Sequence, residues 1–179
     1  MTSLQQAMQP FDLLGPLPRG TTLLEASAGT GKTFAVGALV TRYVAEGHAA
    51  LEEMLVITFG RAASQELRER VRAQLVEAER ALVDPAAARA TGGLVGLLAA
   101  VDDAEVAARR TRLRDALASF DSATIATTHQ FCQLVLRSLG VAGDTDSGAE
   151  LVENLDELVS AVVDDVYLRR FGNQAQEPP

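Results

Sequence analysis

Short apolar runs alternate along the chain with longer segments in which apolar residues recur every three or four positions. The runs TTLLEA (21–26), MLVITF (54–59) and SATIAT (122–127) have the length and composition of buried strands. A segment with helical spacing follows each of them. This alternation predicts an α/β fold built on a parallel sheet.

The helical segments are predicted from the same spacing, at about 32–46, 61–82, 103–118, 128–139 and 149–171. The second is the most regular and carries apolar residues on one face and charges on the other, which we expect to be a solvated surface. Asp102 and Asp103 stand at the start of the third and can cap it. The Ala/Gly-rich stretch 84–101 predicts a loop and a short helix, and the tail 172–179 has a disordered composition.

Composition adds three limits to this picture. The chain has 179 residues, of which 47% are hydrophobic, enough for one domain with a sizeable core. A net charge of −8 means that any nucleic-acid-binding face must be local. Cys132 is the one cysteine, which excludes an internal disulfide and is expected to be a buried small residue.

No segment of the sequence resembles a membrane anchor or a secretory signal. The first twenty residues have neither a basic stretch nor a long apolar core. No apolar run approaches the roughly eighteen residues of a membrane span. We therefore expect a cytoplasmic location and no membrane partner. The Ala- and Arg-rich composition, with scarce lysine, indicates a GC-rich and actinobacterial source.

Lys32 is the only lysine among sixteen basic residues, and it lies in the stretch EASAGTGKT (25–33). The stretch follows a predicted strand and opens a predicted helix. Its spacing, Ala26-x-x-x-x-Gly31-Lys32-Thr33, is that of a phosphate-binding loop with Ala in place of the first Gly. A chance glycine-rich turn is the alternative, and the spacing, the Gly-Lys-Thr end and the strand–loop–helix context together argue against it.

The loop chemistry assigns candidate roles and two cofactors, ATP and Mg²⁺. Glycines let the backbone curl around a phosphate with its N–H groups inward, and the helix N-terminus adds partial positive charge. Lys32 would face the β- and γ-phosphates, and the Thr33 hydroxyl would reach Mg²⁺. The candidate catalytic residues are Lys32 and Thr33. The nucleotide-binding residues are expected to be Ala26, Ser27, Ala28, Gly29, Thr30, Gly31, Lys32 and Thr33.

Two further stretches resemble motifs of superfamily 1 DNA helicases of the UvrD/Rep group. MLVITFGRAASQELRERV (54–71) is similar to motif Ia, and TIATTHQFCQLVL (124–136) is similar to motif Ib with its Thr-x-His-x-Phe core. The loop EASAGTGKT, together with Thr-His-x-Phe-Cys and the early FDLLGPLP, resembles the RecB branch of that group. Members of this branch are beta subunits of exodeoxyribonuclease V. The resemblance covers about residues 11–171.

The resemblance implies a RecA-like P-loop NTPase domain, with helices on both faces of its parallel sheet. It also implies partners, namely single-stranded DNA, duplex DNA ends, and RecC-like and RecD-like subunits. It places DNA contacts on matching positions, which are Thr58, Phe59, Arg61, Thr128, His129 and Phe131. Without the resemblance, Phe59 would be read as a core aromatic and His129 as a cap or packing residue.

The sequence departs from the helicase pattern at two clear positions. Gly60 replaces the hydroxyl or amide residue that commonly follows Thr-Phe, which puts one phosphate contact in doubt. Ala26 replaces the first loop glycine, which this group tolerates. Gln9 has no certain match to the adenine-reading glutamine of many relatives, so no role is assigned to it.

A motor of this class also needs a strand ending in Asp-Glu, for Mg²⁺ and for activation of the attacking water. LDEL (155–158) and VVDD (162–165) have acids after apolar residues, but their helical spacing places both on one helix. We therefore expect an N-terminal piece of a longer helicase that is inactive by itself. Its predicted parts are a motor-domain segment at 1–140 with a helical insertion at 84–120, the start of a helical subdomain at 141–171, and the tail.

Two other functions stay open at this point. The first is a small nucleotide kinase, for which the cluster RRTRLR (109–114) could supply lid arginines. Formation of ADP from ATP and a nucleoside monophosphate would identify it. The second is a non-enzymatic interaction module, which would bind a RecC-like or RecD-like partner without ATPase activity.

Overall fold

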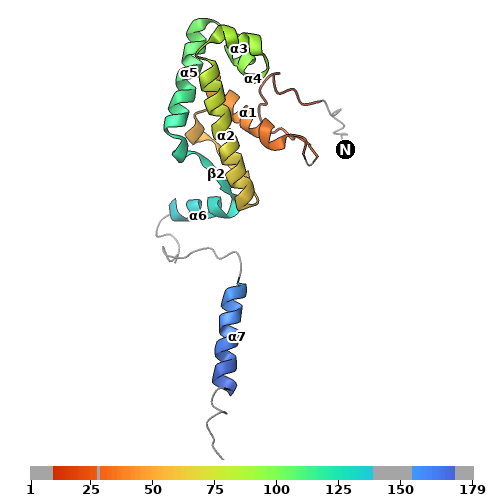
Figure 1. The fold of residues 1–179 in the computed structure, drawn as a ribbon, viewed down its shortest axis with the longest axis vertical. Helices are drawn as coiled ribbons and strands as arrows, with labels where there is room; N and C mark the ends of the chain where they lie inside the picture. Colours follow the sequence, from red (N-terminus) through yellow and green to blue (C-terminus); the bar gives the residue numbers. More distant parts are fainter. Residues whose placement is uncertain (1–9, 28, 139–154, 172–179) are drawn as a thin grey trace, which may run out of the picture. The chain divides into compact units, whose positions relative to one another are not determined.

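The computed structural model describes residues 10–27, 29–138 and 155–171 (Figure 1). The chain divides into two compact units, with the boundary between Leu136 and Arg137. Each unit is described by itself. Residues 139–154 and the predicted tail 172–179 lie outside the described residues, and the predicted domain limits therefore stay predictions.

The sheet of the first unit consists of two parallel strands, β1 (Leu55–Thr58) and β2 (Thr124–Thr127). Leu55 lies opposite Thr124 and Thr58 opposite Thr127, so the two strands end at the same edge. Both strands fall within predicted runs. The α/β fold with parallel strands is confirmed.

Helix α2 (Arg61–Ala81) follows β1 directly and packs against both strands and against α1 (Lys32–Ala45) (Figure 1). Its apolar stripe is buried as its spacing predicts, since Leu67, Val71, Leu75, Ala78 and Leu82 are all in the core. Its charged face is not only a solvated surface. The guanidinium carbons of Arg68 and Arg72 lie 5.3 and 5.8 Å from the ring centroid of Phe120, within cation–π range.

The stretch expected as a loop and one short helix forms two helices, α3 (Pro85–Thr91) and α4 (Gly93–Ala99). Asp84 caps the first by accepting from the N–H groups of Ala86 and Ala87, and Gly92 separates the two helices. The low complexity of this stretch concealed the break, because Ala favours helix throughout it.

Helix α5 (Asp103–Ala118) begins at the predicted cap, where the Asp102 carboxylate accepts from the N–H of Glu105. The short 3₁₀ turns η1 (Leu51–Glu53) and η2 (Phe120–Ser122) lead into the strands. Arg112 and Arg109 both donate to the Glu105 carboxylate, at 3.0 and 3.3 Å, and they lower its pKa below the ordinary value.

The prediction of a strand at 21–26 is wrong for this structure. These residues are exposed and carry no ladder, and Leu23 is 82% exposed. A parallel strand needs a hydrogen-bonded neighbour, and the sheet in the described chain contains only β1 and β2. The apolar run 21–26 thus has the residue types of a strand but no neighbouring strand among the described residues to pair with.

One face of the sheet is covered and the other is open in the described residues. Val56 and Ile125 face the core beneath α2. Leu55 and Ile57 point to the opposite face and are 45% and 42% exposed. The prediction of helices on both faces is thus met on one face only in the described part of the chain.

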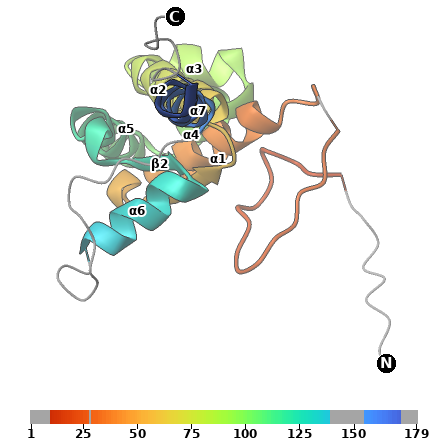
Figure 2. The same ribbon diagram turned by 90° about the horizontal axis from the view of Figure 1, so that it is seen from below.

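Helix α6 (Thr128–Ser138) continues directly from β2 (Figure 2). No residue along this helix is buried. Cys132 is exposed, which corrects the expectation of a buried cysteine. Cys132 would be buried only if another element packed against α6.

The second unit contains α7 (Asp156–Phe171). LDEL and VVDD both lie on or at the start of this helix, so neither is a strand end, as their spacing predicts. Residues 149–154 of the expected longer helix lie outside the described part. None of the helices described combines the length and apolarity that a membrane crossing needs.

Candidate nucleotide and DNA site

The phosphate-loop stretch forms a turn that leads straight into α1. Gly29 and Gly31 have φ of 76° and 89°, in the left-handed region that other residues adopt only at a cost. A Cβ at either position would meet no atom within 4 Å. The loop thus depends on glycine because of its backbone conformation and not because of crowding at these positions.

Lys32 is the first residue of α1 and folds back over the loop. Its Nζ donates to the carbonyl oxygens of Ala26 at 3.1 Å and Ser27 at 2.5 Å. The Ser27 carbonyl also accepts from the hydroxyl of Thr30 at 2.8 Å. The ammonium group therefore sits over the loop, on carbonyl oxygens that are exposed to solvent.

These residues fit a polyphosphate ligand. Phosphate oxygens are stronger partners for an ammonium group than solvated carbonyls, and Lys32 is exposed and free to turn toward them. Thr33 is half-buried in the first turn of α1, beside the same helix N-terminus. Ala28, also expected in the loop, lies outside the described residues.

The predicted DNA contacts meet at one edge of the sheet. Thr58 and Thr127 are register partners at the ends of β1 and β2. Phe59 follows Thr58 and is 98% exposed, so it is not the core aromatic that its type alone would favour. Arg61 begins α2 two residues later.

Thr128 and His129 are the first two residues of α6, and both are exposed. Phe131 lies two residues after His129 and is half-buried. The structure therefore brings the two predicted DNA-contact segments side by side, although they are 70 positions apart in sequence (Thr58 to Thr128).

Packing of α1 on α2 connects the phosphate loop to this edge. Gln74 on α2 is buried and its Nε2 donates to the carbonyl of Phe34, in the first turn of α1, at 3.3 Å. Gly37 on α1 makes the close approach possible, because a Cβ there would lie 2.4 Å from the Gln74 Oε1.

Sequence reasoning missed two residues that fix the site. Arg42 is 5% exposed and its Nη1 donates to the carbonyls of Leu13 at 2.8 Å and Gly15 at 2.7 Å, which ties the segment before the loop to α1. Gln130 makes reciprocal hydrogen bonds with Thr127 at the start of α6. The pattern Thr-x-x-Gln could have revealed the second, while nothing local marks the first.

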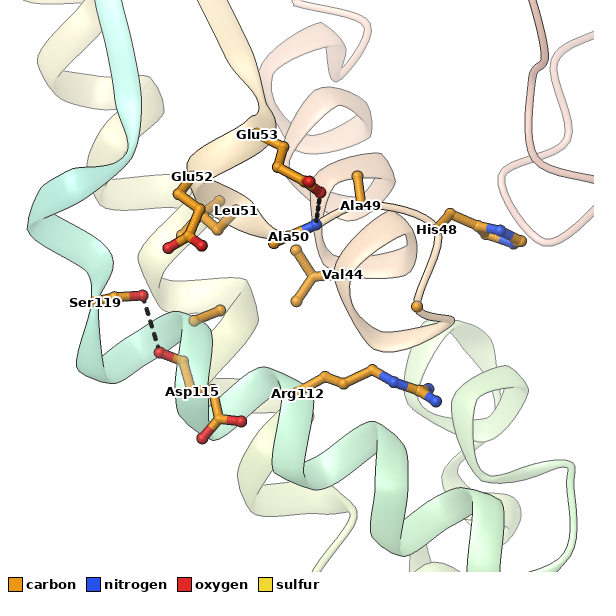
Figure 3. A pocket seen from close by; sticks show the side chains of 12 residues that line it. Val44, His48, Ala49, Ala50, Leu51, Glu52, Glu53, Arg112, Asp115 and Ser119 are labelled. Atoms are coloured by element: carbon orange, nitrogen blue, oxygen red, sulfur yellow. Dashed lines mark hydrogen bonds between the residues drawn. The ribbon is translucent and has the colours of Figure 1, made fainter.

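A pocket of about 370 Å³ lies elsewhere, between the C-terminal end of α1 and α5 (Figure 3). Val44, Leu51 and Arg112 are among its lining residues. Val44 is twelve positions from Lys32, which is about 18 Å along the helix at 1.5 Å per residue. This pocket therefore lies at the far end of α1 from the phosphate loop.

A family model described as the UvrD/REP helicase N-terminal domain matches residues 11–177 of the chain. The chain belongs to this helicase family. Its phosphate loop and the paired segments at the sheet edge correspond to the motifs on which the sequence resemblance was based. The P-loop NTPase fold of the family agrees with the α/β architecture found here.

Members of the helicase family with high similarity to this chain are named "RecBCD enzyme subunit RecB". The protein of Mycolicibacterium smegmatis is 66% identical over 173 residues, and that of Mycobacterium tuberculosis H37Rv is 62% identical over 173 residues. Each alignment covers 96% of this chain and 16% of the relative. The protein of Escherichia coli K12 is 37% identical over 149 residues, which cover 76% of this chain and 12% of that protein. The chain thus spans about a sixth of the length of its mycobacterial relatives.

Proposed function

We propose that this chain is the phosphate-loop part of an ATP-dependent DNA helicase and exonuclease subunit, which unwinds duplex DNA ends in recombinational repair. The observation that carries the proposal is the loop before α1, where two left-handed glycines precede Lys32 and Thr33. The helicase family and the names of the relatives support the same function.

Nucleotide binding is assigned to the loop residues Ala26 to Thr33. Backbone N–H groups and the Lys32 ammonium would hold the phosphates of ATP, and the Thr33 hydroxyl would hold Mg²⁺. The bound ion would neutralise charge that develops on the phosphoryl oxygens. Lys32 contributes to this by exchanging its two carbonyl partners for phosphate oxygens.

DNA binding is assigned to the sheet edge. Phe59 projects into solvent from the end of β1, where its ring can stack on a base of single-stranded DNA. Thr58 and Arg61 would contact the phosphate backbone of the DNA. Thr128, His129 and half-buried Phe131 would form the second DNA contact. This edge also supplies the local DNA-binding face that a chain of net charge −8 needs.

The name of the relatives describes a subunit of a RecBCD enzyme, so we infer RecC-like and RecD-like subunits as partners of the complete protein. We also propose a cytoplasmic location. We further propose that 1–140 belongs to the first motor domain, with 84–120 inserted in it, and that 141–171 begins a helical subdomain.

The kinase alternative is not favoured, because the arginines that it requires are engaged elsewhere. Arg109 and Arg112 pair with Glu105, while Arg110 and Arg114 pair with Glu79, at distances of 2.9 to 3.6 Å. Arg112 also donates to the carbonyl of Ala45, at the end of α1 remote from the loop. These side chains hold helices together.

The proposal is tested with the complete polypeptide encoded by the source gene, together with its partner subunits. Phe59→Ala is expected to weaken single-stranded DNA binding by about 1–3 kcal/mol, the usual contribution of one stacked base. Phe59→Trp should retain affinity because it keeps the stacking surface. Phe11→Ala removes another exposed aromatic ring and is the matched control. Equal DNA affinity for Phe59→Ala and wild type would contradict the assigned interface.

A further inference from the structure

The turn between β2 and α6 is closed by a reciprocal pair of hydrogen bonds. The backbone N–H of Thr127 donates to the Oε1 of Gln130 at 2.9 Å, and the N–H of Gln130 donates to the Oγ1 of Thr127 at 3.2 Å. Thr127 directly precedes the helix and Gln130 is its third residue. This geometry is a capping box, in which each side chain satisfies the other residue's free N–H group.

The capping box is fastened to the sheet. Thr127 is 4% exposed and pairs in register with Thr58, the residue before Phe59. Between the two members of the box lie only Thr128 and His129, both exposed (Figure 2 shows α6 running directly out of β2). The box therefore sets where these two residues stand relative to Thr58 and Phe59.

Burial adds little to this restraint in the described part of α6. Helix α6 has no buried residue along its described length, so core packing does not hold its first turn in place. A helix end that lacks packing and a cap frays, because its first N–H groups have no partners. The Thr127–Gln130 box thus holds the start of α6, whereas packing in the core holds α2.

We propose that Gln130 is a positioning residue for DNA binding, acting through its capping box with Thr127. It holds Thr128 and His129 beside Phe59 so that both segments engage one DNA strand together. The inference rests on the proposed DNA interface and adds a residue that does not itself need to touch DNA.

The test measures single-stranded DNA affinity and its salt dependence in the complete polypeptide with its partner subunits. Gln130→Ala and Thr127→Val each remove one half of the box. Loss of a cap typically costs about 1 kcal/mol, which corresponds to about fivefold weaker binding. Thr127→Ser keeps the hydroxyl acceptor, and Gln133→Ala removes a glutamine one turn further along α6. Both controls should bind within about twofold of wild type, because Thr127→Ser retains the hydroxyl of the box and Gln133 lies outside the box.

A double-mutant cycle separates positioning from general stability. Because Gln130 is proposed to act through Thr128 and His129, Gln130→Ala should have little further effect on DNA affinity when both of these residues are already Ala. Nucleotide affinity should be unchanged in every variant, because α1 and its loop are not part of the box. Amide exchange at residues 128–131 should accelerate in Gln130→Ala and Thr127→Val.

The outcomes distinguish the two proposals. Wild-type DNA affinity in Gln130→Ala, with accelerated exchange and with Phe59→Ala still defective, would overturn the positioning role and leave the interface intact. Full additivity with the combined Thr128→Ala and His129→Ala variant would also overturn it. If neither Phe59→Ala nor His129→Ala alters DNA affinity, the proposed interface itself fails.

Discussion

At the scale of single residues, the site depends on side chains that bridge distant parts of the backbone. Lys32 closes the phosphate loop on its own carbonyls, which keeps a compact charge near the helix N-terminus. Arginine would be a poor substitute, because its planar fork needs more room than the loop gives to an ammonium group. Arg42, by contrast, uses its fork to hold two carbonyls of the N-terminal segment and the Glu46 carboxylate.

Replacement of Arg42 is the residue-scale prediction. Arg42→Ala should lower the free energy of unfolding by about 3 kcal/mol, because it leaves Glu46 and two carbonyls without their buried donor. Urea denaturation measures this change, and limited proteolysis should show earlier cleavage near residues 13–19. Arg114→Ala, at a more exposed ion pair, should cost less than about 1 kcal/mol. Equal losses for the two variants would contradict the assigned tether.

At the scale of elements, contact between α1 and α2 sets the distance between the phosphate loop and the sheet edge. Gly37 permits the close crossing, and Gln74 fills the space above it. The Oε1 of Gln74 is buried without a hydrogen-bond partner in the described structure, so this contact relies on shape and on one bond from Nε2. Such a contact is sensitive to a single methyl group.

Gly37→Ala is therefore expected to destabilise the chain. A clash in a packed interface costs about 1–3 kcal/mol, and the gain in helix propensity offsets about 1 kcal/mol of it. In a Gln74→Ala background the clash is absent, so Gly37→Ala should stabilise by about 1 kcal/mol. Thermal denaturation of the four variants measures this reversal of sign.

A matched glycine provides the control. Gly96 lies inside α4, and a Cβ there would contact the Ala88 carbonyl at an ordinary 3.4 Å. Gly96→Ala should therefore be neutral or stabilising by up to about 1 kcal/mol. If Gly37→Ala were to behave like Gly96→Ala in the wild-type background, α1 and α2 would not be in the close contact described.

At the scale of the whole molecule, the described part holds only some of what ATP hydrolysis requires. The phosphate loop is present and exposed, while the strands β1 and β2 end in threonines and not in an Asp-Glu pair. The sheet face with Leu55 and Ile57 leaves apolar surface exposed, since these residues are 45% and 42% exposed. The affinity of the chain for nucleotide should also be weak, because the phosphate loop alone supplies few of the contacts that bind ATP.

The 179-residue chain by itself is therefore predicted to lack steady-state ATPase activity. Its rate should equal that of the Lys32→Ala variant, with and without single-stranded DNA, in a coupled assay of ADP release. The complete polypeptide with its partner subunits serves as the positive control, and it should lose activity on Lys32→Ala. Turnover by the isolated chain that disappears on Lys32→Ala would refute this prediction.

The sequence by itself determined the features that depend on neighbouring residues. Helix starts, the Asp102 cap, the glycine-dependent loop and the buried stripe of α2 all follow from local spacing and backbone preference. The motif spacing in the sequence also indicates the helicase family, because the chemistry of a phosphate-binding loop restricts the residue types at adjacent positions.

Only the tertiary structure decided the features that depend on distant partners. It left 21–26 without a strand neighbour, exposed Cys132 and Phe59, and tied Arg42 to Leu13 and Gly15. It also paired Thr58 with Thr127, which brings the two predicted DNA-contact segments to one edge of the sheet. Pairing and burial are properties of two segments at once, so neither segment's own residues can specify them.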